Sequence, residues 1–268
     1  MKNHQIMQIK EMTTFAEMAR IVNIKKLKRG VKMPHWFPLL RRRKDLASLT
    51  AIEQQRFLCA FEMLNQSGQL SQFVSIHAAT MAHRQHGTLR FLPWHRVMLF
   101  VVESALEAFH PDVTIPYWDW TNPTEQQIPL WLQRYTPLVN TPTGNIQVVR
   151  APGTQTDLAT IVSNIPSIMD STTFPYFSMD SLGGIELPHD YVHGWVGGSM
   201  SAIATAPADP IFFMHHTNID RLWWDWQNGA GSGINPALTG EDSIMDPWSY
   251  SEPDTRKINQ FPLGYQYI

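Results

Sequence analysis

The stretch FVSIHAATMAHRQHGTLRFLPWHR, residues 73–96, contains the first of two histidine sets that decide the fold. The second set comes from LPHDYVHGWVGG, residues 187–198, and from DPIFFMHHTNIDRLW, residues 209–223. The two sets of three are His77, His86 and His95, followed by His189, His193 and His216. Neutral imidazole is the commonest metal ligand among side chains, and three imidazoles without a thiolate or carboxylate suit Zn, Cu, Fe or Ni. Two such sets predict a pair of metal ions. Because the ligands carry no negative charge, we expect two copper ions that cycle between Cu(I) and Cu(II) with bound oxygen.

Local signals around these stretches predict helices. Thr50, with Glu53 three residues later, forms a capping box for a helix that should end near residue 65. Ser71 is a suitable cap for the next helix. Pro93 fits the first turn of a third helix that ends before His110. This third helix is apolar nearly all round, so we expect it at the centre of the molecule.

The second half of the chain predicts two more helices. A short helix starting at Pro188 would place His189 and His193 one turn apart on the same face. Asp209 as cap and a proline at the first position open the last helix, which should run to about residue 227. Residues 121–175 are rich in Pro, Thr, Asn and Gly and are predicted to be a long connection with little regular structure. The expected fold class is mainly α, a four-helix-bundle core that holds a dinuclear copper site, with long irregular loops.

The charge distribution divides the chain in two. Residues 1–44 carry 12 Lys and Arg against two Glu, a net charge of +10, so the remaining residues carry about −12. We therefore separate a basic N-terminal arm, residues 1–44, from a metal-binding domain, residues 45–268. Such an arm can contact nucleic acid or anionic lipid. Pairing with the chain's own acidic surface is the simpler explanation, so we do not expect nucleic acid as a partner.

The single cysteine and the first residues bear on the compartment. Cys59 excludes an intrachain disulfide. Its apolar neighbours, Phe57, Leu58, Ala60 and Phe61, predict a buried structural thiol. Residues 1–30 lack the continuous apolar stretch of a secretory signal, and no apolar run is long enough to span a membrane. These observations favour the cytoplasm.

The histidine spacing resembles the tyrosinase family, also called type-3 copper proteins, in a short bacterial-like form without a C-terminal lid domain. Eight residues separate His86 from the histidine of FLPWHR, as in the family's first copper motif. The second motif has H-x-x-x-H followed by V-G-G, then D-P-x-F-x-x-H-H-x-x-x-D, which ends here at Asp220. The PYWDW segment and the closing Tyr265-Gln266-Tyr267 are further landmarks, so the resemblance covers roughly residues 45–268.

This resemblance implies the chemistry. Residues 45–268 would be a dicopper catalytic domain that uses O2 to oxidise o-diphenols to o-quinones and to hydroxylate monophenols such as tyrosine at the ortho carbon, the chemistry of melanin formation. An o-aminophenol oxidase is an alternative enzyme, and a hemocyanin-like oxygen carrier uses the same six histidines. The expected partners are phenolic small molecules, O2 and a copper-delivery helper. The chain ends at the tyrosine motif, so we expect no covering lid.

The resemblance also assigns roles near the metals. It selects His216 rather than His215 as the third ligand of the second set, and His215 would make a packing contact. In relatives that hydroxylate monophenols well, an Asn often follows the first histidine of this set, and an upstream Glu orders a water. Here Asp190 follows His189, and Glu186 lies three residues before it, so Asp190 either acts as the base or repels the phenolate.

Five further residues complete the expected site. Asp220, one turn beyond His216, would orient the site through an arginine or a histidine. Phe91 and Phe212 would pack against the imidazoles and exclude water. Gly194 removes a side chain beside His193, and Ile203 is expected over the second copper, so both would shape substrate access. His83 falls outside the eight-residue spacing and is not expected to bind metal.

Overall fold

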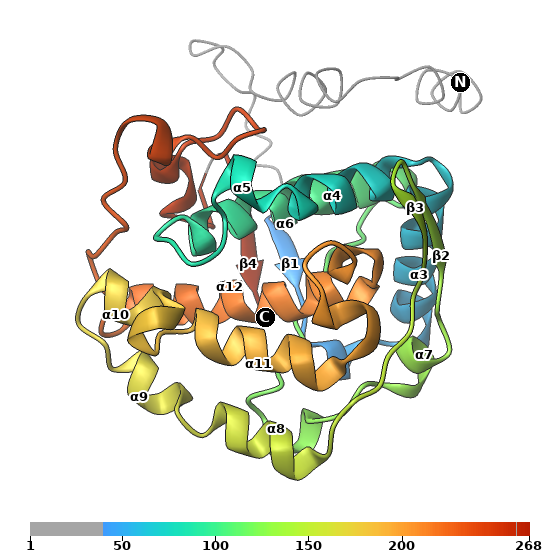
Figure 1. Cartoon of the computed structure of the whole chain (residues 1–268), viewed down its shortest axis with the longest axis horizontal. Coiled ribbons are helices and arrows are strands. Elements are labelled where there is room, and N and C mark those ends of the chain that lie inside the picture. The colour runs from blue at the N-terminus through green and yellow to red at the C-terminus, as the bar shows by residue number, and fades with distance from the viewer. Residues whose placement is uncertain (1–39, 261) are drawn as a thin grey trace.

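The computed structural model describes residues 40–260 and 262–268, and in these ranges the chain is mainly helical (Figure 1). The longer helices are α3 (Ala51–Gln66), α4 (Gln69–Ala78), α6 (Phe91–Phe109), α8 (Gln155–Val162), α11 (Glu186–Val196) and α12 (Pro210–Asn228). The shorter ones are α5 (Thr80–His83), α7 (Leu130–Gln133), α9 (Ile165–Met169) and α10 (Phe174–Ser178). The mainly α fold predicted from the sequence is confirmed.

Helix α6 lies at the centre of the core, as its apolar sequence predicts. It packs against both α3 and α12, and α3 in turn contacts α4. Its consecutive residues from Phe91 to Glu103 are all buried. Helix α11 lies next to α12, as the 3.1 Å separation between the Nε2 atoms of His189 and His216 shows. The site-bearing helices therefore surround one interior.

Capping explains where several helices begin. The Thr50 hydroxyl accepts a hydrogen bond from the Glu53 amide at 3.3 Å, and the Glu53 carboxylate accepts one from the Thr50 amide at 2.9 Å. Asp209 accepts a hydrogen bond from the amide of Ile211 at 2.9 Å at the start of α12. Both caps were predicted. The expected cap at Ser71 is wrong, because Gly68 in the left-handed conformation (φ 77°) already starts α4 at Gln69.

The long connection has more structure than its composition predicts. Strands β2 (Leu138–Thr141) and β3 (Gly144–Gln147) form an antiparallel hairpin, and α7, α8 and α9 lie in the same region. The prediction of little regular structure over residues 121–175 is wrong there. Elements of four to eight residues are too short to show a helical or strand period in the sequence.

Two short strands join the two ends of the described chain. Strand β1 (Arg41–Arg43) pairs in parallel with β4 (Tyr265–Tyr267), with Arg41 opposite Tyr265. Residues 41–44 thus belong to the folded unit, although we assigned them to the basic arm. Residues 1–39 of this arm lie outside the described ranges.

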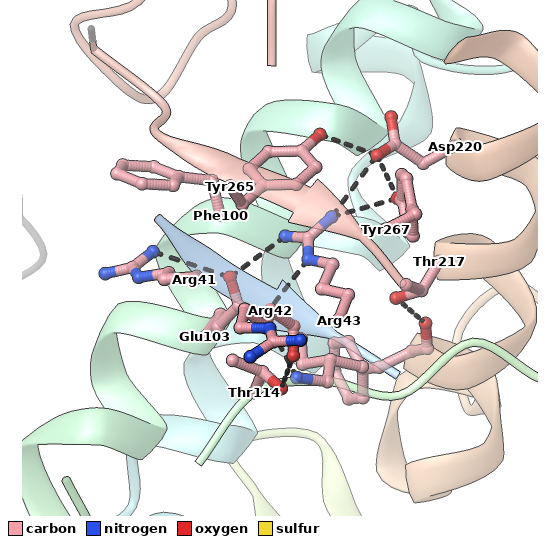
Figure 2. A network of polar contacts seen from close by, with 12 residues as sticks. Arg41, Arg42, Arg43, Phe100, Glu103, Thr114, Thr217, Asp220, Tyr265 and Tyr267 are labelled. Carbon is pink, nitrogen blue, oxygen red and sulfur yellow. Dashed lines mark hydrogen bonds and ion pairs between the residues drawn. The ribbon is translucent and has the colours of Figure 1, made fainter. Parts of the chain in front are cut away.

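The basic residues of β1 pair with acidic side chains of the same chain. Arg41 lies 2.6 Å from the carboxylate of Glu107. Arg43 lies 3.0 Å from the carboxylate of Glu103 (Figure 2). Lys44 lies 2.5 Å from Glu53. These three basic residues thus pair with acidic residues of the same chain, as the simpler explanation of the basic arm predicts.

Two smaller expectations concern the surface. Cys59 is exposed, so the prediction of a buried thiol is wrong. It lies on α3 between residues that face the core and residues that face solvent. Among the described residues, no helix has both the length and the apolar composition needed to cross a membrane.

Candidate metal centre

The first histidine set comes from three different elements. His77 lies in the last turn of α4, His95 lies in the first turns of α6, and His86 lies in the loop between α5 and α6. One ligand atom from each of them lies within 4.8 Å of the others. The structure therefore brings together the three residues that the spacing selected.

The second set lies on two helices. His189 and His193 are one turn apart on α11, and His216 faces them from α12. Their Nε2 atoms are separated by 3.1, 3.1 and 3.4 Å. Two nitrogens bound at about 2.0–2.1 Å to one tetrahedral ion are about 3.3 Å apart. These separations fit three ligands on one face of a metal ion.

His215 is also close to this set. A ring nitrogen of His215 lies within 4.8 Å of ligand atoms of His189 and His193, which makes it a second candidate. Its ring stacks on that of His189, with centroids 4.9 Å apart and planes 14° apart. Stacked rings direct their lone pairs side by side rather than toward one point. We therefore assign the third position to His216, whose Nε2 approaches both partners, and a packing role to His215.

Hydrogen bonds at the far ring nitrogens orient most of these imidazoles. His77 Nδ1 donates to the carbonyl of Ile203 at 2.9 Å, and His193 Nδ1 donates to the carbonyl of Met200 at 2.9 Å. His95 Nδ1 donates to the carbonyl of Phe91 in its own helix at 2.8 Å. A proton on Nδ1 leaves a lone pair on Nε2, and the bond fixes the plane of the ring. Each of these three histidines thus presents Nε2 to the interior.

The electrostatics favour neutral imidazoles. Burial lowers the pKa of His77, His95, His189 and His216 well below the ordinary value. It lowers the pKa of His86 and His193 to about 4. The buried Nε2 atoms of His77 and His95 have no hydrogen-bond partner among the described residues. The ring nitrogens of each histidine set therefore direct their lone pairs toward a common point. A cation bound at that point would offset the repulsion between them.

The two sets form one dinuclear centre. The rings of His95 and His216 are stacked, with centroids 4.4 Å apart. Phe91 lies 4.8 Å from His189, and Phe212 lies 4.2 Å from His216, measured between ring centroids. Both phenylalanines are buried, so they pack against imidazoles of the site and keep water from them.

A buried polar network lies beside the stacked pair. Asp220 accepts hydrogen bonds from Tyr267, from Arg43 at 3.2 Å and from Tyr265 at 2.6 Å (Figure 2). It also accepts one from Arg96. Arg96 follows His95 in α6, and Asp220 is one turn beyond His216 in α12. We predicted that Asp220 acts through an arginine, and that arginine is Arg96. Their ion pair links the two ligand-bearing helices, α6 and α12. Sequence reasoning missed the role of Arg96, although it is the last residue of the FLPWHR motif.

Glu186 links the two histidine sets. Its carboxylate accepts a hydrogen bond from the amide of Gly87, next to His86, at 2.7 Å. The other carboxylate oxygen is buried without a partner among the described residues. Burial raises the pKa of Glu186 to about 8. This residue, on the first turn of α11, therefore holds the loop that carries His86.

The other predicted residues lie around the site in different ways. Asp190 has a half-exposed side chain that lies 3.0 Å from His189 Nδ1. Apart from its own helix backbone, nothing lies within 4 Å of the position that a Cβ at Gly194 would take, so this glycine borders open space. Ile203 is exposed, and its main chain contacts His77 of the first set rather than the second set. His83 Nδ1 lies 2.5 Å from the carboxylate of Asp246, away from both sets.

Comparison with known proteins agrees with this geometry. The chain matches the family model described as the common central domain of tyrosinase over residues 67–155 and 134–229. Tyrosinase from Streptomyces glaucescens is 32% identical over 258 residues, which cover 79% of this chain and 93% of that protein. Tyrosinase from Streptomyces antibioticus is 31% identical with nearly the same coverage. A G-type hemocyanin of Enteroctopus dofleini is 30% identical over 70% of this chain, which is 7% of that protein.

Solved structures share the fold. A functional unit of octopus hemocyanin superposes with a TM-score of 0.67 at 25% identity, covering 84% of this chain and 67% of that one. Tyrosinase from Burkholderia thailandensis gives a TM-score of 0.69 at 17% identity, covering 85% of this chain and 74% of that one. With two adjacent histidine triads in this fold, and with relatives aligned along most of its length, the chain belongs to the tyrosinase family of dicopper oxidoreductases.

Proposed function

We propose that this protein uses O2 to oxidise o-diphenols to o-quinones and to hydroxylate monophenols such as tyrosine. The observation that carries the proposal is the pair of adjacent imidazole triads, whose lone pairs converge on two centres. When bound there, two copper ions supply the two electrons by which O2 is reduced. The chain itself holds the metals, excludes water and positions the phenol.

The protein's side chains divide these tasks. Phe91 and Phe212 pack on the imidazoles, so they keep the interior of the site apolar. Asp190 lies at the open side of the second set, and its exposed carboxylate is the nearest candidate to take the proton of a monophenol before hydroxylation. Glu186 fixes the position of His86 through Gly87. A diphenol needs no hydroxylation step, so its oxidation depends less on Asp190.

An oxygen carrier is the main alternative from another class, because the same fold serves the octopus hemocyanin unit. Coverage favours the enzyme, since the Streptomyces tyrosinases align over 93–94% of their own length. An o-aminophenol oxidase is the alternative among enzymes.

Oxygen uptake by the copper-loaded protein separates these three functions, with tyrosine, catechol and o-aminophenol measured side by side. Catalytic uptake with catechol is expected. Reversible O2 binding without turnover would indicate a carrier, and turnover confined to o-aminophenol would indicate the other oxidase.

Delivery of copper by a partner protein is a further part of this proposal. Four of the six proposed ligands, His77, His95, His189 and His216, are almost fully buried, so a free ion has little access to them. Metal-free protein incubated with a copper salt should then load slowly. Faster loading after addition of an extract from the source cells would support a helper. Complete loading within the mixing time would argue against one.

A further inference from the structure

A groove of about 560 Å³ is lined by residues of α8 and α11. These two helices contact each other and lie side by side in Figure 1. Its lining comes from both helices, with Asp157 and Ile161 on α8, and with Asp190, Tyr191, Gly194 and Trp195 on α11. None of the proposed copper ligands lines it. The groove is thus a separate surface next to the site.

The groove adjoins the second histidine set along α11. Asp190 follows His189, and its carboxylate lies 3.0 Å from the Nδ1 atom of that ring. Gly194 follows His193 and leaves open space where a side chain would project. The groove therefore has free space at Gly194, beside the second histidine set.

The lining combines apolar walls with negative charge. Tyr191, with 54% of its surface exposed, and Ile161 supply aromatic and aliphatic area. Asp157 and Asp190 supply two carboxylates, and none of the lining residues is basic. Asp157 is held in place because its carboxylate accepts hydrogen bonds from the amide and hydroxyl of Thr154 at 2.9 and 2.7 Å. Aromatic rings and carboxylates together attract an organic cation.

We propose that this groove binds the ring substituent of the phenolic substrate and favours a substituent that carries an ammonium group over one that carries a carboxylate. This inference rests on the proposed function, because it concerns the substrate class of that same site. An arylalkylamine would place its ring at the metal centre, with its phenol oxygen toward Asp190, and its ammonium group farther along the groove, beside Asp157. A substituent ending in a carboxylate would meet the like charge of Asp157 there.

Three catechols test the inference because they differ in charge and share the reacting ring. They are 2-(3,4-dihydroxyphenyl)ethylamine, neutral 4-methylcatechol and 3-(3,4-dihydroxyphenyl)propionate. The measurement is the ratio of kcat/KM for the amine to kcat/KM for the acid, at low ionic strength. A ratio taken within one preparation cancels differences in copper loading. We expect a ratio above one that falls as salt is added, because the carboxylates are solvent-exposed and screened.

Two variants change the charge of the groove in different ways. Asp157→Asn should lower the ratio roughly two- to fivefold, the range for one solvent-exposed charge pair. Ile161→Arg adds a positive charge on the same wall without touching the cap of α8, and it should lower the ratio further. Asp254→Asn is a matched control, since Asp254 makes the same capping interaction with Ser251 at a distance from the groove. This control should leave the ratio unchanged.

The outcomes separate the groove from the activity. If 4-methylcatechol is oxidised but the wild-type ratio is one or less, or if Asp157→Asn and Ile161→Arg both leave it unchanged, the groove has no such preference. If the copper-loaded protein oxidises none of the three catechols, the proposed function itself is wrong. A ratio that falls in both groove variants and stays constant in the control supports the inference.

Discussion

The two histidine sets differ in how the fold holds them. The second set stands on two long helices, α11 and α12, and its three Nε2 atoms lie within 3.4 Å of one another. The first set has two ligands on helices, but His86 lies in a loop, and its Nδ1 atom has no hydrogen-bond partner among the described residues. A helix fixes the position of a ligand residue through its own backbone hydrogen bonds. A loop needs contacts from other parts of the chain to hold a ligand in place. The position of His86 therefore depends on contacts from distant parts of the chain.

One such contact comes from Glu186, which binds the amide of Gly87. The others come from a C-terminal clamp, which we define as residues 240–248. Asp246 accepts from Arg90 at 2.5 Å and pairs with His83 at 2.5 Å, and these two residues flank the loop of His86. Trp94 donates to the carbonyl of Asp246 at 2.7 Å. The clamp therefore stabilises both ends of the loop. The second set is held differently, because Asp220 ties its helix α12 to α6 through Arg96 and to strands β1 and β4 through Arg43 and Tyr265.

The largest effect is expected from the second set itself. His216→Ala should abolish phenol oxidation and lower the copper content by one ion, because it removes one of three convergent nitrogens. His215→Ala should keep both copper ions, because its ring packs on His189 without pointing at the centre. Metal analysis and oxygen uptake check both variants. Loss of copper from His215→Ala together with an intact His216→Ala would reverse the assignment.

The next effect concerns the network that anchors α12. Asp220→Ala should lower the free energy of unfolding by about 3–5 kcal/mol, because it leaves the buried guanidinium groups of Arg43 and Arg96 without one of their partners. Denaturant unfolding of the metal-free protein measures this directly. Asp225→Ala on the same helix removes an exposed pair with Arg221 and should cost less than about 1 kcal/mol. Equal losses in the two variants would show that the network does not anchor the helix.

Asp190 tests whether the second set also carries the proton chemistry. Asp190→Asn keeps an oxygen that can accept from His189 Nδ1 and removes the charge. Tyrosine turnover should fall by about 10²-fold or more, because a positioned base contributes roughly 10²–10⁴-fold to a proton transfer. Catechol turnover and copper content should change little. Equal changes with both substrates, or loss of copper, would give Asp190 a structural role instead.

The clamp gives the smallest effect and the most direct test of the first set. Asp246→Ala should weaken binding of one of the two copper ions about tenfold, because residues that orient a ligand typically contribute 10–100-fold to metal affinity. His83→Ala, which leaves the Arg90 pair in place, should keep most of the oxidase activity. Competition with a copper chelator measures the affinity of each ion.

Asp242→Ala is the matched control for the clamp. Asp242 pairs with Arg84 at 2.8 Å, but both side chains are about half exposed, so this pair contributes little. A change in affinity as large as that of Asp246→Ala would mean that the clamp acts as a whole rather than through the buried Arg90. Inactive His83→Ala with active His86→Ala would instead show that the first set is wrongly assigned.

The sequence predicted the helices and the residues of the centre better than the contacts between distant segments. Capping at Thr50 and Asp209 and the apolar run of α6 are local patterns, so the helices they start or fill could be expected. The pairing of Asp220 with Arg43 joins residues 177 positions apart, and no periodicity reveals such a partner. The hold of Asp246 on the His86 loop was missed for the same reason.

Copper stoichiometry tests the central claim most directly. Each triad supplies three neutral imidazoles, so each should hold one ion without a further ligand type from the protein. The protein reconstituted with copper and freed of excess metal should contain two copper ions per chain, measured by elemental analysis against protein concentration. A single copper ion per chain in the active protein, or stoichiometric zinc in its place, would contradict the account.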